Sequence, residues 1–545
     1  MAKKSAPLVM VSSGYVEGSW SEDIAVFKGI PYAKPPVGEW RWRPPQPVAP
    51  WEGVQKAKKF SPTAWQAAAG LESFLGNLID GQGWGKMRTW SMKKMLKFAP
   101  APKQSEDCLY LNVRTPNVDP NANLPVMVWI HGGDHQDGSG SDPYYDSDAL
   151  AKKAVVFVSI NYRLGILGYY AHPELSAESE QGVSGNYGTL DQVAALQWVR
   201  DNIGVFGGNP NNVTIFGESA GGESVAHMLT TPLARGLFHR AIMQSPANGG
   251  QMIHLKQPFL DYLSAEEQGV AFAKKLGIVR SKQLARLRRA SPKTLYDTLH
   301  QDIRLGSFYP VIDGYVLPKS PFEAFYDGEQ APVPLLVGSN ADEGTIIYPI
   351  FDAPMIEYQH REIGTHQMAP YIRDAFKEDA DRLVTLYPGL ERRDRKTEID
   401  FLGDIFFGSK ARFYAEHASN ADQPTYFYMF KRVPPSPKQT AGAFHAAELA
   451  FVHGASVPIL PMNEQDWALS RQMIDYWTNF AKTGDPNGYA LAKWTPFSAQ
   501  QPQWMSLDIH QVGVQTVDRE EKYQIFNAYT RRLIHAMKEL HASSM

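Results

Sequence analysis

The feature that most constrains the fold is an alternation of short apolar segments and helical patterns between residues 125 and 244. Residues 125–130 and 155–160 are short and rich in β-branched side chains, as expected of strands buried on both faces. They are followed by a helical pattern between Leu190 and Ile203, a strand pattern at 212–216, a helical pattern from Ala220 and a strand pattern at 239–244. This order predicts a mostly parallel central sheet flanked by helices.

Three other regions carry no strand pattern of this kind. Residues 255–310 and 350–425 have helical patterns, and we expect them to form helical insertions above the sheet, so that residues 1–545 make a single domain. Residues 66–104 contain several glycines that are expected to break up their first half, followed by a short basic amphipathic piece at 90–98. That region is either a lid over a pocket or a surface helix with its methionines and tryptophan packed inward.

Composition excludes several other classes of protein. Hydrophobic residues make up 43% and charged residues 20% of the chain, which is typical of globular proteins and not of collagen-like, coiled-coil or disordered ones. The net charge is −3 and no long basic run occurs, so no nucleic-acid partner is expected. The chain has a single cysteine, Cys108, which excludes an intrachain disulfide and most cysteine-based metal sites.

No apolar run approaches the roughly 20 residues that a membrane-spanning helix needs, so no integral membrane segment is expected. The first residues carry two lysines but no apolar stretch behind them, unlike a signal peptide. We therefore expect a cytoplasmic protein. A secreted or periplasmic mature form that has lost its signal peptide would have the same sequence.

The motif with the clearest chemistry is Gly217-Glu218-Ser219-Ala220-Gly221, which matches G-x-S-x-G. It follows a predicted strand and begins a predicted helix. On such a tight turn the serine takes a strained backbone conformation, and its hydroxyl stands free at the end of the sheet. The alternative is an ordinary glycine-rich turn with a helix-capping serine. The strand and helix on either side favour the nucleophile.

A serine nucleophile needs a base and an acid, which follow it along the chain in this type of fold. Asp342 and Glu343 come directly after a predicted strand at 334–338, where functional residues collect in open α/β sheets. His445 lies in a loop of small residues and His453 follows eight positions later. Spacing alone does not choose among these candidates.

Backbone donors for an oxyanion are predicted at His131-Gly132-Gly133-Asp134, directly after the strand at 125–130. Glycines there let backbone N–H groups come close to a ligand. A plain strand-to-loop turn would also contain glycines, but it would not explain their presence beside a G-x-S-x-G motif.

Over nearly its whole length the chain resembles type-B carboxylesterases, the cholinesterase-like branch of the α/β-hydrolases. The similar segments are 27–33 (FKGIPYA), 105–112 (SEDCLYLN), 161–165 (NYRLG), 185–191 (GNYGTLD), 206–210 (FGGNP) and 479–486 (NFAKTGDP). Together they are far more specific than any one motif. The resemblance implies an α/β-hydrolase fold with helical insertions forming a lid and pocket region.

Carried over by position, the resemblance assigns Ser219 as nucleophile, Glu343 as acid and His445 as base. The oxyanion donors would be the backbone N–H groups of Gly133, Asp134 and Ala220. The family also implies two structural ion pairs, Arg41 with Glu106 and Arg163 with Asp191, and Glu218 as a buried polar support rather than an acid.

The chain departs from the family pattern in two places. Cys108 lacks its usual disulfide partner near position 65. Asp134 stands where the family has a third oxyanion glycine, and His135 stands where an aromatic residue is usual. The Asp134 carboxylate could repel the oxyanion, or hold a water against an acylated or phosphorylated serine. Otherwise it turns away and pairs with His135 or a nearby cation.

These observations predict a serine hydrolase that cleaves small-molecule carboxylic esters through a covalent acyl-enzyme. Neither a metal nor an organic cofactor is implied. Two alternatives stay open: an amidase or carbamate hydrolase on the same residues, and a non-catalytic cholinesterase-like interaction protein. The second is disfavoured because proteins of that kind lose the serine or the histidine, and both are present here.

Overall fold

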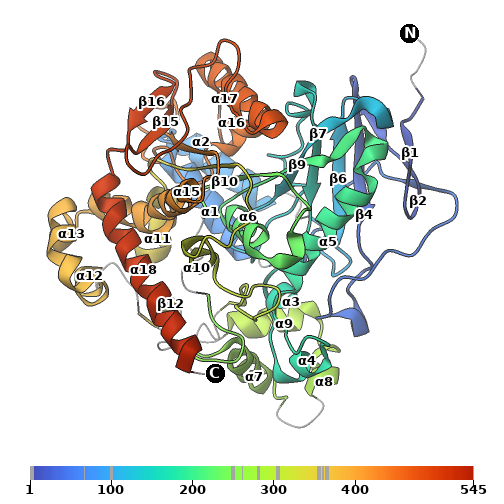
Figure 1. Cartoon of the computed structure of the whole chain (residues 1–545), viewed down its shortest axis with the longest axis horizontal. Coiled ribbons are helices and arrows are strands. Elements are labelled where there is room, and N and C mark those ends of the chain that lie inside the picture. Colours follow the sequence, from blue (N-terminus) through green and yellow to red (C-terminus); the bar gives the residue numbers. More distant parts are fainter. Residues whose placement is uncertain are drawn as a thin grey trace.

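The computed structural model describes residues 5–66, 68–98, 102–246, 252–259, 262–278, 283–301, 307–352, 357–358, 361–362 and 368–543. In this part of the chain the central sheet has eleven strands, in the order β16-β15-β14-β11-β10-β9-β7-β8-β6-β4-β3 (Figure 1). The strands are β3 (Ser19–Ser21), β4 (Ile24–Pro31), β6 (Tyr110–Thr115), β7 (Leu124–Ile130), β8 (Val156–Ile160), β9 (Gly208–Glu218), β10 (Arg240–Gln244), β11 (Leu335–Asn340), β14 (Thr425–Phe430), β15 (Gln503–Leu507) and β16 (Gly513–Thr516).

The middle of this sheet is parallel, as predicted. Every pairing from β8 through β7, β9, β10, β11 and β14 to β15 is parallel. The outer pairings at both edges are antiparallel. The edge strands come from the two ends of the chain, where apolar runs are weaker, and the sequence patterns did not reveal them. A separate small sheet pairs β1 (Leu8–Val11), β2 (Gly14–Glu17) and β5 (Val54–Lys56).

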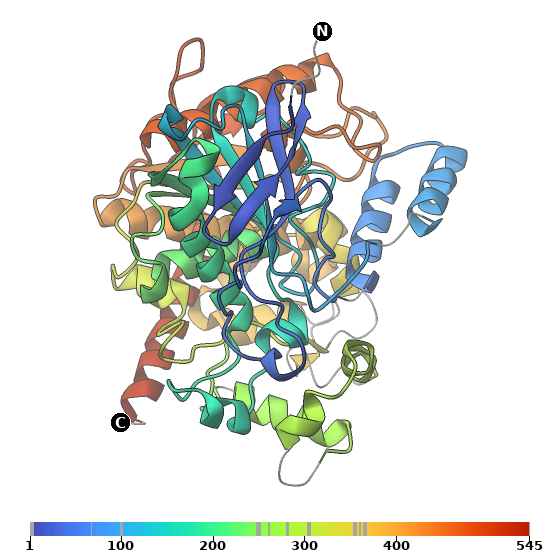
Figure 2. The same cartoon turned by 90° about the vertical axis from the view of Figure 1, so that its right-hand side faces the viewer.

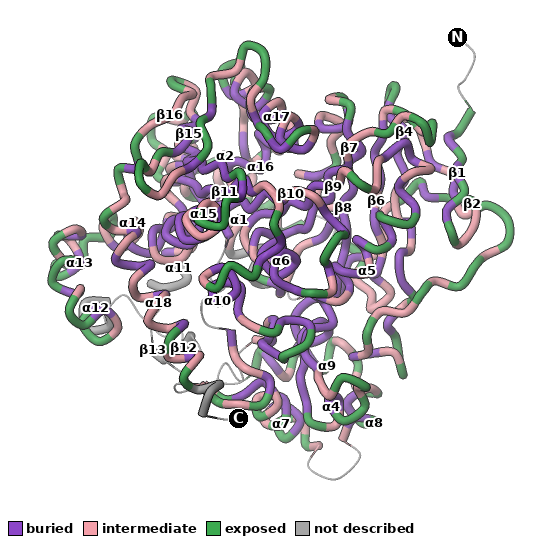
Figure 3. The backbone as a smooth tube through the Cα atoms, viewed as in Figure 1, coloured by how far each residue is buried: buried purple, intermediate pink, exposed green. Residues whose placement is uncertain are grey.

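Side chains of the central strands feed two hydrophobic cores, one on each face. On β7, Val126, Val128 and Ile130 enter one core and Met127 and Trp129 the other, as the alternation of a strand requires. The first core includes residues of α5 (Tyr187–Asn202), α6 (Ala220–Thr230), α15 (Ser409–Asn420) and α18 (Glu520–Ser543), and the second those of α16 (Leu449–His453) and α17 (Glu464–Thr483). Figure 3 shows the central strands as largely buried, as expected of strands that lie between the two cores.

The two predicted insertions are largely helical where they are described. Residues 255–310 contain α7 (Ala265–Lys275), α8 (Gln283–Leu287) and α9 (Pro292–His300), and residues 350–425 contain α12 (Met368–Phe376), α13 (Ala380–Leu386), α14 (Arg395–Gly403) and α15. A short ladder of β12 (Glu357–Tyr358) and β13 (Arg361–Glu362), which the sequence patterns did not predict, lies in the second region. The described helices outside these regions include α3 (Gly165–Tyr169), α4 (Pro173–Glu178), α10 (Pro321–Tyr326) and α11 (Gly344–Asp352).

Residues 66–104 form a helical hairpin of α1 (Ala68–Gly81) and α2 (Lys86–Phe98). The expectation that glycines break up the first half is wrong, because Gly70 and Gly76 lie inside α1. A glycine costs a helix only about 1 kcal/mol, which the packing of α1 against α11 offsets. Of the two alternatives for this region, the surface helix with its methionines and tryptophan packed inward does not hold, since α2 has no buried residue. The lid over a pocket stays a prediction.

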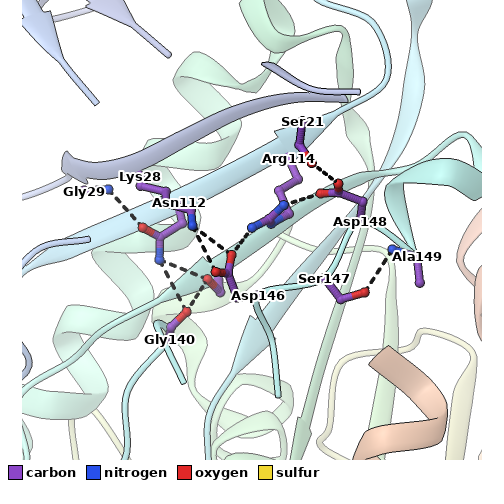
Figure 4. A network of polar contacts seen from close by, with 11 residues as sticks. Ser21, Lys28, Gly29, Asn112, Arg114, Gly140, Asp146, Ser147, Asp148 and Ala149 are labelled. Carbon is purple, nitrogen blue, oxygen red and sulfur yellow. Dashed lines mark hydrogen bonds and ion pairs between the residues drawn. The ribbon is translucent and has the colours of Figure 1, made fainter. Parts of the chain in front are cut away.

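Polar contacts anchor the long loop between β7 and β8 to the neighbouring strands (Figure 4). Arg114 of β6 pairs with both Asp146 and Asp148. The carbonyl of Gly140 accepts hydrogen bonds from Ser159 Oγ at 2.6 Å and Asn112 Nδ2 at 3.3 Å. The far end of this loop is thereby fixed, which limits the positions that its first residues, 131–137, can take.

None of the described helices is long and apolar enough to cross a bilayer.

Candidate active site

Ser219 lies on the tight turn between β9 and α6, at φ 56° and ψ −126°. A side chain at Gly217 would lie 2.4 Å from the carbonyl oxygen of Gly221, and one at Gly221 would lie 2.2 Å from that of Ile130. Glycine is therefore required on both sides of the serine. The structure has the strand, strained turn and helix that the sequence predicts.

Glu343 lies just beyond the end of β11 and is 2% exposed. Its Oε1 accepts hydrogen bonds from the backbone N–H of Asn340 at 2.7 Å and from the Ser245 hydroxyl at 2.5 Å. Its Oε2 lies 2.6 Å from His445 Nδ1. These contacts fix the carboxylate so that one oxygen faces the imidazole.

The neighbouring Asp342 has a different position. Its Oδ2 accepts the backbone N–H of Ala443 at 2.8 Å, and its own N–H donates to the carbonyl of Ala443 at 3.0 Å. The carboxylate also lies directly beneath Gly442. Asp342 therefore braces the backbone of the loop that carries His445, while Glu343 contacts the imidazole.

His445 is buried against the ring of Phe407, with ring centroids 4.3 Å apart. Burial lowers its pKa, but the carboxylates of Glu218 and Glu343 outweigh burial and raise the pKa to about 9. His453 occupies an aromatic cluster around Trp129, and burial lowers its pKa to about 3. Of the two candidate histidines, only His445 faces a carboxylate at the end of the sheet.

The imidazole Nε2 of His445 lies 3.2 Å from Glu218 Oε1. Among the described residues, no hydrogen bond joins Ser219 Oγ to His445. Such bonds are often long in enzymes without substrate and tighten when substrate binds. Burial raises the pKa of Glu218 to about 8, although His445 acts in the opposite direction.

The loop after β7 packs against Ser219 from the other side. A side chain at Gly132 would come within 3.2 Å of Ser219 Cβ. Gly133 and Asp134 both have positive φ, 104° and 55°. In the described part of the chain, the N–H groups of Gly133, Asp134 and Ala220 donate to no protein acceptor. Three backbone donors are thus available beside the serine.

The sequence model of the Carboxylesterase family matches residues 5–526. The chain belongs to the carboxylesterase family. The predicted type-B family membership is confirmed, and the protein is a carboxylic ester hydrolase.

Named relatives of this carboxylesterase are esterases. The para-nitrobenzyl esterase of Bacillus subtilis is 35% identical over 532 residues, covering 95% of this chain and 98% of that protein. The fumonisin B1 esterase of Sphingopyxis macrogoltabida is 34% identical over 498 residues, covering 89% of this chain and 83% of that protein. A solved PNB esterase structure superposes with a TM-score of 0.77 at 34% identity, covering 96% of this chain and all of that one, which confirms the α/β-hydrolase fold.

Asp134 is one of the two positions at which the sequence of this carboxylesterase is interpreted as departing from the family pattern. Its side chain is exposed and its Oδ2 accepts a hydrogen bond from the Tyr309 hydroxyl at 2.7 Å. Desolvation by surrounding protein raises the carboxyl pKa to about 6, although the Tyr309 hydrogen bond acts in the opposite direction. No cation pairs with it among the described residues. Its partner is therefore a tyrosine, not His135 or a cation.

His135 turns into the protein instead. It is buried, with Nδ1 3.4 Å from the hydroxyl of Tyr169 and Nε2 3.5 Å from Glu223. Glu223 lies in the first turn of α6, four residues after Ser219. The positive φ of both Asp134 and His135 sends their side chains to opposite sides of the loop: one to the surface and one to the interior.

Both predicted ion pairs are present and both are bidentate. Arg41 binds Glu106 at 2.6 Å twice, and Arg163 binds Asp191 at 2.7 Å twice. Cys108 is buried and unpaired, as predicted. No group of three or more potential metal ligands occurs among the described residues.

Two contact residues were not identified from the sequence. Ser245, which holds Glu343, directly follows β10 and has φ 43°. The rule that functional residues follow parallel strands could have identified it. Tyr309, which holds Asp134, lies at the end of the first helical insertion, and no sequence pattern marks it.

Proposed function

We propose that Ser219, Glu343 and His445 form a catalytic triad that hydrolyses carboxylic esters through a covalent acyl-enzyme. The observation that carries the proposal is the 2.6 Å contact between Glu343 Oε2 and His445 Nδ1. The other imidazole nitrogen of His445 lies 3.2 Å from Glu218, the residue that precedes Ser219 on the strained turn. The Glu343 carboxylate selects the tautomer with the proton on Nδ1. Nε2 is then left unprotonated and can act as a base.

In the first half of the reaction, Ser219 Oγ attacks the ester carbonyl carbon while His445 Nε2 takes the hydroxyl proton. The carbonyl oxygen becomes an oxyanion, which the N–H groups of Gly133, Asp134 and Ala220 would stabilise by hydrogen bonds. His445 then gives the proton to the alkoxy oxygen as its bond to carbon breaks. The alcohol leaves, and the acyl group stays on Ser219.

Water completes the cycle by the same steps. His445 Nε2 takes a proton from water, and the hydroxide oxygen attacks the acyl carbon. Collapse of the second tetrahedral intermediate breaks the bond to Ser219 Oγ, which recovers its proton from His445. During both halves the imidazolium lies against the Glu343 carboxylate. The raised pKa of His445, about 9 in spite of burial, supports this part of the proposal.

We treat residues 1–545 as one catalytic unit, because the strands that carry the site and those at the sheet edges come from both ends of the chain. The substrates would be small-molecule esters, as the names of the para-nitrobenzyl and fumonisin B1 esterases suggest for those relatives. A panel of matched ester, amide and carbamate substrates separates esterase from amidase or carbamate hydrolase activity.

The direct test is covalent labelling. Diethyl para-nitrophenyl phosphate should react with one equivalent of enzyme and abolish hydrolysis of para-nitrophenyl acetate. Mass spectrometry of a digest should find the diethylphosphoryl group on the peptide containing Ser219. Ser219→Ala is the matched control and should remain unlabelled. Label on another residue, together with undiminished hydrolysis, would contradict the proposal.

A further inference from the structure

We propose that α2 docks on the surface of an anionic phospholipid bilayer. This inference goes beyond ester hydrolysis and does not depend on the triad. α2 has no acidic residue and carries five basic ones, Lys86, Arg88, Lys93, Lys94 and Lys97. Lys93 pairs with Asp80 of α1 at 2.6 Å, and the other four have no carboxylate partner among the described residues. Because the whole chain has a net charge of −3, this concentration of positive charge is local.

Large apolar side chains are exposed on the same helix. The exposed fractions are 83% for Met87, 61% for Trp90, 54% for Met95 and 72% for Phe98. Isolated exposed apolar residues are normal on a protein surface, but four within three helical turns form a patch. A helix that combines basic residues with exposed tryptophan, phenylalanine and methionine has the composition of helices that lie in a membrane interface.

The patch faces away from the body of the protein. The less exposed residues Thr89, Met92 and Leu96 form one stripe of α2, and α2 contacts α1. α1 in turn packs against α11, directly after Glu343. The two light-blue helices in Figure 2 project from one side of the molecule, so a flat surface could reach α2 without first meeting the body.

The placement of one lysine favours a lipid surface over a groove on another protein. Lys94 Nζ lies 5.3 Å from the ring centroid of Trp90 and 5.5 Å from that of Phe98. A protein groove that receives apolar anchors excludes charges from its centre. In the headgroup region of a bilayer, by contrast, lysine and aromatic side chains lie at the same depth, with the ammonium group near phosphate.

The charge of α2 also argues against a second copy of this chain. In a symmetric dimer the same surface of each copy meets the other. Five basic side chains would then face five more, with no acidic residue on either helix. An anionic lipid surface instead supplies a dense layer of opposite charge, and each lysine or arginine near it adds roughly fivefold to binding.

Docking through α2 would bring the site close to the lipid. The carbonyl of Gly81, at the end of α1, accepts hydrogen bonds from the N–H groups of Thr440 at 2.8 Å and Ala441 at 3.1 Å. These residues lead directly to the loop of His445. If the proposed function holds, esters dissolved in the bilayer would then be the substrates at hand.

The test is sedimentation of the full chain with vesicles, using Ser219→Ala so that hydrolysis plays no part. Binding should be strong to vesicles of equal parts phosphatidylglycerol and phosphatidylcholine, weak to phosphatidylcholine alone, and reduced by salt because screening weakens it. Lys94→Gln with Lys97→Gln should reduce binding about 30-fold. Trp90→Ala with Phe98→Ala should reduce it at least about tenfold.

The matched control is Lys293→Gln with Lys396→Gln, which removes two charges from exposed lysines on α9 and α14. It should bind vesicles like the parent. With Ser219 restored, all three double variants should hydrolyse para-nitrophenyl acetate at the parental rate, which shows that they are folded. If the α2 variants lose vesicle binding but keep full hydrolysis, the loss is due to α2 alone. If the parent protein binds vesicles but does not hydrolyse esters, only the proposed triad is contradicted.

Three outcomes would overturn the proposal. The first is a parent protein that binds neither kind of vesicle, or binds both equally. The second is a control variant that loses as much binding as the variants in α2. The third is a dimer, detected by sedimentation equilibrium, that the α2 substitutions dissociate and that binds no vesicles, which would make α2 a contact between copies of the chain.

Discussion

The two loops that flank Ser219 are built for opposite charges. On one side, the Glu343 carboxylate is buried, hydrogen-bonded twice, and aimed at His445. On the other, the backbone N–H groups of Gly133 and Asp134 donate to no acceptor in the described part of the chain. Acyl transfer creates an imidazolium and an oxyanion together, so a positive charge would develop beside the first loop and a negative one beside the second. Asp134, a carboxyl group in the second loop, runs against this division.

Removing the serine between the two loops should have the largest effect. Ser219→Ala should reduce kcat by about 10⁴-fold or more, because neither loop can act without the nucleophile. Hydrolysis of para-nitrophenyl acetate measures this loss, and an unchanged circular dichroism spectrum and melting temperature would show that the fold is intact. A variant that keeps a tenth of the parental activity would show that another residue is the nucleophile.

The next effect tests the loop on the histidine side. Glu343→Gln should reduce kcat by about 10³- to 10⁴-fold, because an amide neither selects the right imidazole tautomer nor stabilises the imidazolium. Asp342→Asn is the matched control one position away. It should lose far less, since Asp342 braces the backbone of Ala443 and does not contact His445. Equal losses, or a larger loss at Asp342, would reverse the roles given to these two acids.

This pair of acids illustrates what the sequence could predict. The central strands and the Ser219 turn follow from apolar runs and glycine spacing, which are local properties. The choice of Glu343 over Asp342 needed the family resemblance, because both residues follow the same strand. The contact between Asp134 and Tyr309 joins residues 175 positions apart. No local pattern encodes such a contact. The exposure of α2 could not be predicted either, because exposure depends on what the rest of the chain leaves uncovered.

A third effect sharpens the electrostatics of the histidine side. As a base, His445 must be neutral, so kcat/KM should rise with pH toward its pKa of about 9. Glu218 is the strongest of the charges that raise this pKa. Glu218→Gln should therefore move the rise in kcat/KM to lower pH, with less loss at the plateau than Glu343→Gln causes. The pH profile measures the shift, and a profile that stays in place or moves to higher pH would show that Glu218 does not set the charge of His445.

The smallest effect concerns Asp134, on the oxyanion side. Two charges about 5 Å apart at a solvent-exposed site repel by about 1 kcal/mol, or roughly fivefold in rate. The pKa of Asp134 is about 6, so the carboxylate is charged above that pH and neutral below it. Asp134→Asn keeps the backbone N–H and should raise kcat/KM by this factor at pH 8 but not at pH 5. Tyr309→Phe, which removes only the hydrogen bond, is the matched control and should give no such gain. If the asparagine variant is no faster at any pH, the carboxylate does not repel the oxyanion. The rate at which esterase activity recovers after phosphorylation of Ser219 then decides the role of Asp134. If the asparagine variant recovers more slowly than the parent, the carboxylate holds the attacking water. If both recover at the same rate, Asp134 is a structural substitution.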